Sequence, residues 1–153
     1  MRQILFEQVI KEIKMVRLEH VNLVGKNIEN SLAFYQAAFP HWKIRSEGEG
    51  EWYGKPRRWV HFGDEYQYIA ISDFGEGENR DLSGHSVGFA HLAFAVNNLE
   101  AIIRRLNRAG YPVYKPGSEA KFRKNIYFLD ADGFEVEFTE YLSDLPHQRN
   151  AAE

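Results

Sequence analysis

Residues 20–29 read HVNLVGKNIE and residues 91–100 read HLAFAVNNLE, so one short pattern occurs twice in the chain. Each copy opens with a histidine at the head of an alternating apolar run, and each closes with Asn, an aliphatic residue and Glu. The match extends over several residue types at a constant offset, which chance rarely produces. A repeat of this kind predicts two copies of one structural unit.

The hydrophobic pattern changes period within each copy. Apolar residues first alternate, as in a half-buried strand, and then recur at helical spacing. The two helical stripes are Ile28, Leu32, Tyr35 and Phe39 in the first copy, and Leu99, Ile102, Ile103 and Leu106 in the second. Asn27 and Asn98 precede these stripes as expected N-caps, and Gly110 is the expected C′ residue of the second helix.

Three further strand-like runs follow each helix. They cover residues 42–45, 58–62 and 66–72 in the first copy, and residues 112–114, 125–129 and 134–140 in the second. Each copy therefore reads βαβββ. We expect an α+β fold in which two βαβββ modules form a curled mixed sheet around a metal-binding concavity.

The chain organises as one domain of 153 residues. We place module one at about residues 17–73 and module two at about residues 88–141, with a glycine-rich linker at 74–88. A short amphipathic helix is expected at residues 4–15, with Leu5, Val9 and Ile13 in one stripe. We interpret it as an extension that packs against the body of the protein or a partner.

Composition excludes several classes of function. The net charge is −3 and no basic tract is long enough to follow a phosphate backbone, so nucleic acid is not an expected partner. The chain has no cysteine, which leaves histidine and carboxylates as metal ligands. No uncharged signal-peptide core and no apolar run of membrane-spanning length is present. We expect a cytoplasmic protein without membrane contact.

Side chains alternate between the two faces of a strand, so each strand can be divided into an apolar and a polar face. The polar faces carry His20 with Asn22, His91 with Ala93, and Glu135 with Glu137 and Thr139. A strand histidine is usually structural, yet these two occupy equivalent points of the repeat. Two imidazoles and one carboxylate suit one divalent ion, namely Fe, Mn, Ni or Zn, and leave coordination positions for a substrate.

At these residues the chain resembles a known family. The segments are His20 with NIENSLAFY at residues 27–35, His91, and YFLDADGFEVE at residues 127–137. Together they are similar to the vicinal-oxygen-chelate superfamily, which includes glyoxalase I, fosfomycin-resistance thiol transferases, extradiol dioxygenases and metal-free bleomycin-binding proteins. The resemblance covers roughly residues 17–141 and implies that His20, His91 and Glu137 are the metal ligands.

Departures from the family pattern reduce the number of reactions that we expect this chain to catalyse. Glyoxalase I members add a carboxylate that the repeat places at Ala70, and alanine cannot bind a metal. Extradiol dioxygenases match at Tyr127 but usually carry a histidine where this chain has residues 118–120. The fosfomycin enzymes share Tyr127, yet their basic residue beyond the last strand is not matched near residues 145–147.

Other polar and aromatic residues are expected to contact a substrate. Asn22 shares the face of His20, Trp59 and His61 share a face of one strand, and Tyr127 stands at the equivalent level of the other module. Arg123, with Lys121 and Lys124 beside it, is a candidate for binding a carboxylate. We assign no catalytic residue from the sequence.

The first hypothesis is a metal-dependent lyase, isomerase or transferase that acts on a small oxygenated metabolite. The alternatives are a non-catalytic binding protein of the bleomycin-resistance type and an extradiol-type dioxygenase. Because His20 belongs to module one while His91 and Glu137 belong to module two, the triad exists only where two modules meet. We expect a symmetric homodimer with the site at or beside its interface.

Overall fold

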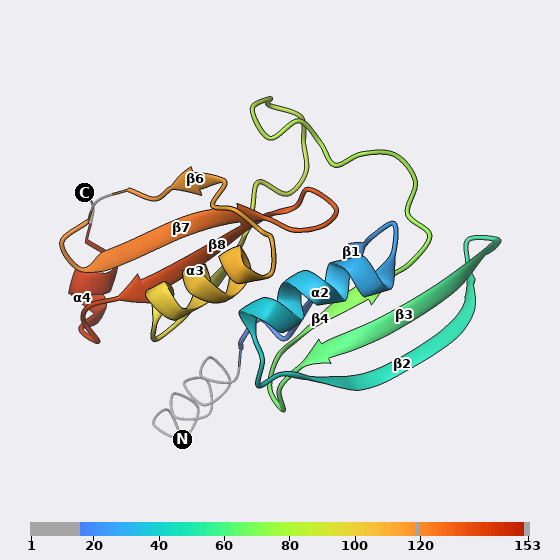
Figure 1. Ribbon diagram of the computed structural model, residues 1–153, viewed down its shortest axis with the longest axis horizontal. Coiled ribbons are helices and arrows are strands. Elements are labelled where there is room, and N and C mark those ends of the chain that lie inside the picture. Colours follow the sequence, from blue (N-terminus) through green and yellow to red (C-terminus); the bar gives the residue numbers. More distant parts are fainter. Residues whose placement is uncertain (1–15, 119, 152–153) are drawn as a thin grey trace, which may run out of the picture.

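Two modules with the same order of elements make up the computed structural model, which describes residues 16–118 and 120–151 (Figure 1). The first contains β1 (His20–Val24), α2 (Ile28–Ala38), β2 (Lys43–Trp52), β3 (Lys55–Gly63) and β4 (Tyr68–Ser72). The second contains β5 (Leu92–Ala95), α3 (Leu99–Arg108), β6 (Lys115–Pro116), β7 (Arg123–Leu129) and β8 (Glu135–Tyr141), followed by α4 (Pro146–Arg149).

Each module forms a four-stranded mixed sheet. The strand orders are β1-β4-β3-β2 and β5-β8-β7-β6, and in each sheet the first and last strands of the module pair in parallel. The predicted α+β architecture of two βαβββ units is therefore confirmed. The amphipathic helix expected at residues 4–15 lies outside the described residues. Among the helices that are described, none is long and apolar enough to cross a membrane.

Four elements differ from the sequence-based expectation. β2 and β3 continue to a turn at Tyr53 and Gly54, both with positive φ, so they are much longer than expected. The polar and glycine-rich segment 46–51 gave no hydrophobic alternation because β2 is an edge strand exposed to solvent. β6 lies at residues 115–116, after the expected 112–114, and α4 was not expected.

Both helices begin as their cap residues predict. Asn27 Oδ1 accepts a hydrogen bond from the Asn30 amide at 2.8 Å, and Asn98 Oδ1 accepts one from the Ala101 amide at 2.9 Å. Gly110, after the end of α3, has a φ of 92°, a conformation that favours glycine. The same type of N-cap residue, an asparagine, therefore starts both helices.

The two modules join through their helices. α2 and α3 lie beside each other, and each covers one face of its own sheet (Figure 1). Phe39 packs on Phe94 with ring centroids 4.8 Å apart, and Arg105 donates to the Ala37 and Ala38 carbonyl oxygens at 3.1 and 2.8 Å. These bonds satisfy carbonyls at the end of α2. The helix-bearing faces form the shared core, so the opposite faces, with His20 and His91, lie outside it.

Candidate metal centre

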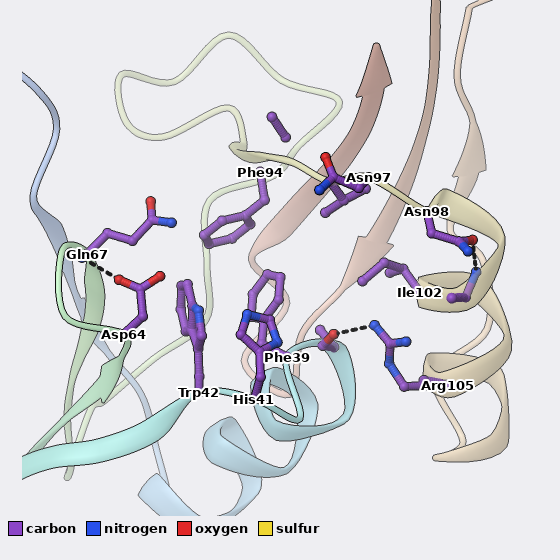
Figure 2. Close-up of a pocket in the computed structure, with 14 residues that line it drawn as sticks. Phe39, His41, Trp42, Asp64, Gln67, Phe94, Asn97, Asn98, Ile102 and Arg105 are labelled. Atoms are coloured by element: carbon purple, nitrogen blue, oxygen red, sulfur yellow. Dashed lines mark hydrogen bonds between the residues drawn. The ribbon is translucent and has the colours of Figure 1, made fainter. Parts of the chain in front are cut away.

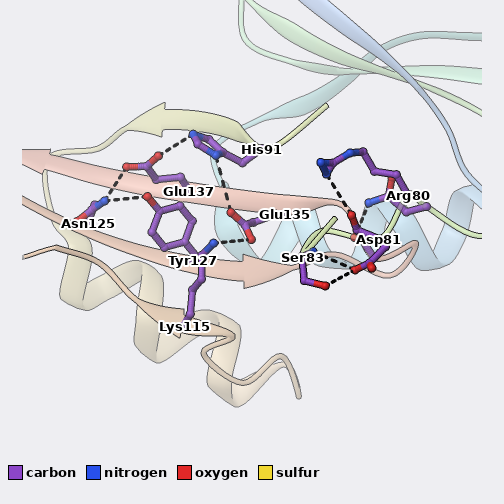
Figure 3. Close-up of polar contacts among 11 residues, drawn as sticks. Arg80, Asp81, Ser83, His91, Lys115, Asn125, Tyr127, Glu135 and Glu137 are labelled. Carbon is purple, nitrogen blue, oxygen red and sulfur yellow. Dashed lines mark hydrogen bonds and ion pairs between the residues drawn. The ribbon is translucent and has the colours of Figure 1, made fainter. Parts of the chain in front are cut away.

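His91 and Glu137 form a close pair on the outer face of the second sheet. His91 directly precedes β5, and Glu137 lies on the neighbouring strand β8, opposite Ala93. His91 Nε2 is 3.1 Å from Glu137 Oε2 (Figure 3). Two atoms that bind one ion at about 2.1 Å with an angle near 90° are separated by about 3.0 Å. The pair therefore has the spacing of two ligands of one divalent ion.

The other carboxylate oxygen of Glu137 is held by hydrogen bonds. Asn125 Nδ2 donates to Glu137 Oε1 at 2.8 Å, and Thr139 Oγ1 donates to the same atom at 2.9 Å. Only 12% of the Glu137 side chain is exposed. These donors fix the carboxylate so that Oε2 points toward His91, which is how surrounding groups commonly orient a metal ligand.

A second carboxylate faces the other nitrogen of His91. Glu135 Oε1 lies 3.7 Å from His91 Nδ1, and Glu135 Oε2 pairs with Lys115 Nζ at 2.9 Å (Figure 3). The Glu135 side chain is almost completely buried, which is costly for a carboxylate without a cation partner. A carboxylate beside Nδ1 supports a proton there, and an ion placed between Nε2 and Glu137 would then be bound by the unprotonated Nε2.

His20, the third predicted ligand, lies on the other module. Its ring stacks on Tyr68 with a centroid distance of 4.6 Å, and its Nδ1 is 3.0 Å from Glu19 Oε2. Within residues 16–118 and 120–151 no three His, Cys, Asp or Glu side chains are grouped to hold a metal. One described chain therefore brings His91 and Glu137 together but does not bring His20 to them.

Strand register shows which positions of the two modules correspond. Ala70 pairs with Asn22 in the first sheet, as Glu137 pairs with Ala93 in the second. Alanine thus occupies the position that the repeat assigned to a carboxylate in module one. His61 pairs with Ala70 as Tyr127 pairs with Glu137, so those two residues are the equivalent ones.

The predicted substrate residues divide between the two outer faces. On the first sheet, Trp59 and His61 rings are 4.7 Å apart, and burial together with the nearby His20 lowers the pKa of His61. On the second sheet, burial and the Glu137 charge raise the pKa of Tyr127. Arg123 lies at the start of β7, opposite Tyr141.

A cavity of about 300 Å³ lies elsewhere, at the seam between the modules (Figure 2). Phe39, Trp42 and Phe94 contribute apolar surface to it, and His41, Asp64, Gln67 and Arg105 lie around them. None of the predicted ligands or substrate residues lines this cavity. Its position on the helix side of the sheets separates it from the His91 and Glu137 pair.

Three residues around the pair were not identified from the sequence: Lys115, Asn125 and Thr139. Thr139 was placed on the correct face by alternation, but nothing marked it as a hydrogen-bond donor to Glu137. Asn125 lies two residues before Tyr127 on the same face of β7, so alternation could have found it. Lys115 reaches Glu135 from β6, a contact between strands that only the pairing reveals.

Known proteins share this architecture. Residues 17–138 match the family model described as Glyoxalase/Bleomycin resistance protein/Dioxygenase superfamily. A glyoxylase/bleomycin resistance protein/dioxygenase domain from Frankia sp. EAN1pec is 24% identical, with a TM-score of 0.67 over 83% of this chain and 98% of that one. No curated protein sequence matches significantly.

Two other solved structures have the same fold at lower identity. The fosfomycin resistance protein FosX from Listeria monocytogenes, complexed with Mn(II) and sulfate ion, is 20% identical. Its TM-score is 0.60 over 88% of this chain and 98% of that one. TnmS3, an antibiotic binding protein from Streptomyces sp. CB03234, is 14% identical, with a TM-score of 0.58 over 83% and 97% of the two chains.

Proposed function

This chain belongs to the glyoxalase, bleomycin resistance protein and dioxygenase superfamily, and on that basis we propose that it is a metal-dependent enzyme. The proposed ligands are His20, His91 and Glu137, and the proposed reaction is a lyase, isomerase or transferase step on a small oxygenated metabolite. The observation that carries the proposal is the 3.1 Å approach of His91 Nε2 to Glu137 Oε2.

Both histidines are oriented alike. Each has Nδ1 directed at a carboxylate, Glu19 for His20 and Glu135 for His91, so an ion would be bound through Nε2 of each ring. Both side chains are also partly open to solvent, with about two fifths of their surface exposed. A carboxylate beside Nδ1 of an imidazole commonly orients the ring so that Nε2 can bind a metal.

A second copy of the chain would complete the triad. β1 and β5 each lie at the edge of a sheet, and an exposed edge is a natural place for pairing with another strand. If β1 of one copy lies beside β5 of the other, a module-one face meets a module-two face. That arrangement brings His20 of one chain to His91 and Glu137 of the second, and twofold symmetry repeats the site.

A divalent ion held by His20, His91 and Glu137 would supply Lewis-acid chemistry to a substrate oxygen. The chain's own residues prepare the surroundings. Tyr127, whose raised pKa keeps its hydroxyl protonated near neutral pH, lies opposite Glu137 and can donate a hydrogen bond to a substrate oxygen. Lys115 lies over the Tyr127 ring at 4.5 Å and adds positive charge beside it.

The second candidate is a binding protein of the same fold. TnmS3, whose structure is similar, is an antibiotic binding protein, whereas the similar FosX structure contains Mn(II). The ordered donors to Glu137 favour the enzyme, because a pure binding pocket has no need of a carboxylate oriented toward an imidazole. An extradiol-type dioxygenase remains a third candidate, distinguished by oxygen consumption with catechols.

Complementation between two inactive variants tests the proposal. His20→Ala and His91→Ala each remove one ligand from every site of their own homodimer. In a mixed dimer, however, one site combines the intact His20 of one chain with the intact His91 and Glu137 of the other. After unfolding and refolding together in equal amounts, random pairing should restore about a quarter of the wild-type metal sites.

The measurement is bound Mn(II) or Zn(II) per chain after gel filtration, followed by turnover of α-keto aldehydes with thiols, epoxides and catechols. Each variant refolded alone should bind no metal tightly, and circular dichroism should show both folded. If the mixture binds no more metal than the separate variants, the site shared between chains is excluded. Wild-type protein that binds no divalent ion would exclude the metal-dependent function altogether.

A further inference from the structure

The outer face of the first sheet carries a fixed hydrogen-bond chain that ends at Asn22. Arg57 Nε donates to Ser72 Oγ at 3.0 Å, and Ser72 Oγ donates to Asn22 Oδ1 at 3.2 Å. Arginine can only donate, so the serine oxygen accepts from Arg57 and its single proton is directed onward. Ser72 is 1% exposed and has little freedom to rearrange.

The hydrogen bonds from Arg57 to Ser72 and from Ser72 to Asn22 fix which end of the Asn22 amide points toward Ser72. Its oxygen is occupied by the serine hydroxyl, while its Nδ2 makes no hydrogen bond within the described residues. Asn22 is exposed and lies one alternation from His20, on the same face of β1. The amide therefore directs its oxygen to Ser72 and has its N–H groups available to donate beside the proposed ligand.

Positive charge surrounds this donor. Arg57 begins the hydrogen-bond chain that leads to Asn22, and its guanidinium lies over the Trp52 ring at 4.4 Å. Arg45 lies over the Tyr68 ring at 4.6 Å, and Tyr68 stacks on His20. Two guanidinium groups thus flank the strand segment that carries His20 and Asn22, although the whole chain has a net charge of −3.

Alternation along β2 keeps carboxylates off the same face. Ser46 contacts His61, so Ser46, Gly48 and Gly50 face the site while Glu47, Glu49 and Glu51 face away. Among the residues of the four strands of this sheet, these three glutamates are the only carboxylates. Glu19, which directly precedes β1, is engaged by His20 Nδ1. Glycine at position 48 also leaves room for the Trp59 ring, which a Cβ would approach to 2.8 Å.

From these contacts we infer that module one is the anion-binding half of the site. It receives an anionic oxygen of the substrate between the Asn22 amide and the guanidinium groups of Arg57 and Arg45. The substrate class is a small oxyanion, such as a carboxylate, with a second oxygen directed at the ion. This inference rests on the proposed function, because that ion would bind the second oxygen.

Oxalate is a suitable probe, since it is small, dianionic and accepts hydrogen bonds without donating them. Its affinity for the Ni(II)-loaded wild-type protein is compared by calorimetry with that of Asn22→Asp, Ser72→Ala and Arg57→Met. Arg108→Met is the matched control, because Arg108 is an exposed residue of α3 and its loss changes the net charge equally. Imidazole, a neutral ligand, reports on the ion alone.

Asn22→Asp and Arg57→Met should each weaken oxalate binding by about tenfold or more, as expected for loss of a charge-assisted hydrogen bond. Ser72→Ala, which only releases the amide, should weaken it by about threefold to tenfold. Arg108→Met should change oxalate affinity less than twofold. Imidazole affinity and Ni(II) content should stay the same in all five proteins.

Unchanged oxalate affinity in Asn22→Asp and Arg57→Met would overturn the inference, as would an equal loss in Arg108→Met. A parallel loss of imidazole affinity would also overturn it, since the substitutions would then act on the ion rather than on an anion site. Wild-type protein that takes up no Ni(II) contradicts the proposed function itself, and this result appears before any oxalate is added.

Discussion

Tyr35 donates its hydroxyl hydrogen to Asp130 Oδ2 at 2.9 Å, and this bond joins α2 of the first module to the turn between β7 and β8 of the second. Both residues are buried, with 0% and 6% of their surface exposed. The other oxygen of Asp130 accepts the amides of Asp132 and Phe134 at 3.0 and 2.9 Å. Burial nevertheless dominates and raises the pKa of Asp130 to about 6.

The raised pKa predicts a stability that depends on pH. An unfolded Asp titrates near 3.8, so between about pH 4 and pH 6 the folded chain binds a proton that the unfolded chain has lost. The free energy of unfolding should therefore fall as pH rises through this window, by up to about 3 kcal/mol from this group. Urea unfolding at several pH values measures the slope of the free energy of unfolding against pH.

Asp130→Asn is the matched variant, because its amide oxygen can accept the Asp132 and Phe134 amides while its Nδ2 donates to the Tyr35 hydroxyl oxygen, and it does not titrate. The contribution of this residue to the slope should disappear. Asp81→Asn, at an exposed loop position, should leave the slope between about pH 4 and pH 6 as in wild type, because the hydrogen bond with Ser83 lowers the pKa of Asp81 and this carboxylate is already ionised in that window. An Asp130→Asn protein with the wild-type pH dependence would show that another group is responsible.

Asn125 should control metal affinity without binding the ion. Its amide holds Glu137 Oε1, so Asn125→Ala should weaken Zn(II) or Mn(II) binding by about tenfold to a hundredfold. Lys124→Ala, at the adjacent exposed position of β7 that faces the other way, is the control and should bind metal normally. Competition with a chromophoric chelator measures both affinities. Equal affinities in the two variants would mean that Glu137 needs no support from Asn125.

Dilution should remove metal and activity together if the site is shared between two chains. The dimer dissociates by mass action, and each separate chain retains only the His91 and Glu137 pair. Analytical ultracentrifugation over a dilution series gives the concentration at which half of the dimer has dissociated. Metal content in the same samples gives the concentration at which half of the metal is lost, and the two concentrations should agree. A monomer that keeps its ion with wild-type affinity would defeat the intermolecular site.

The two N-caps should contribute similarly to stability because they make the same bond. Asn27→Ala and Asn98→Ala each remove an acceptor for an exposed amide, which should cost about 0.5–2 kcal/mol of unfolding free energy. Asn30→Ala, which leaves the capping side chain in place, should cost less than either. Chemical denaturation provides all three values. A larger loss from Asn30→Ala would contradict the capping assignment.

The features that the sequence predicted well depend on local periodicity. Alternation and helical spacing placed both βαβββ units, and the Asn residues at the helix entries were correctly identified as caps. Local rules failed at β2, where the segment 46–51 has no apolar face to bury. There, pairing with β3 alone produces the strand.

The sequence by itself determined the repeated module and the faces on which His20, His91 and Glu137 lie, since side-chain direction follows from the backbone period. Only the tertiary structure decided which of these residues meet within a chain. Packing of α2 against α3 buries the helix-bearing faces in one core and leaves the histidine-bearing faces outside it. The contacts of Lys115 with Glu135 and of Arg57 with Ser72 cross between strands, and no spacing along the chain encodes such distances.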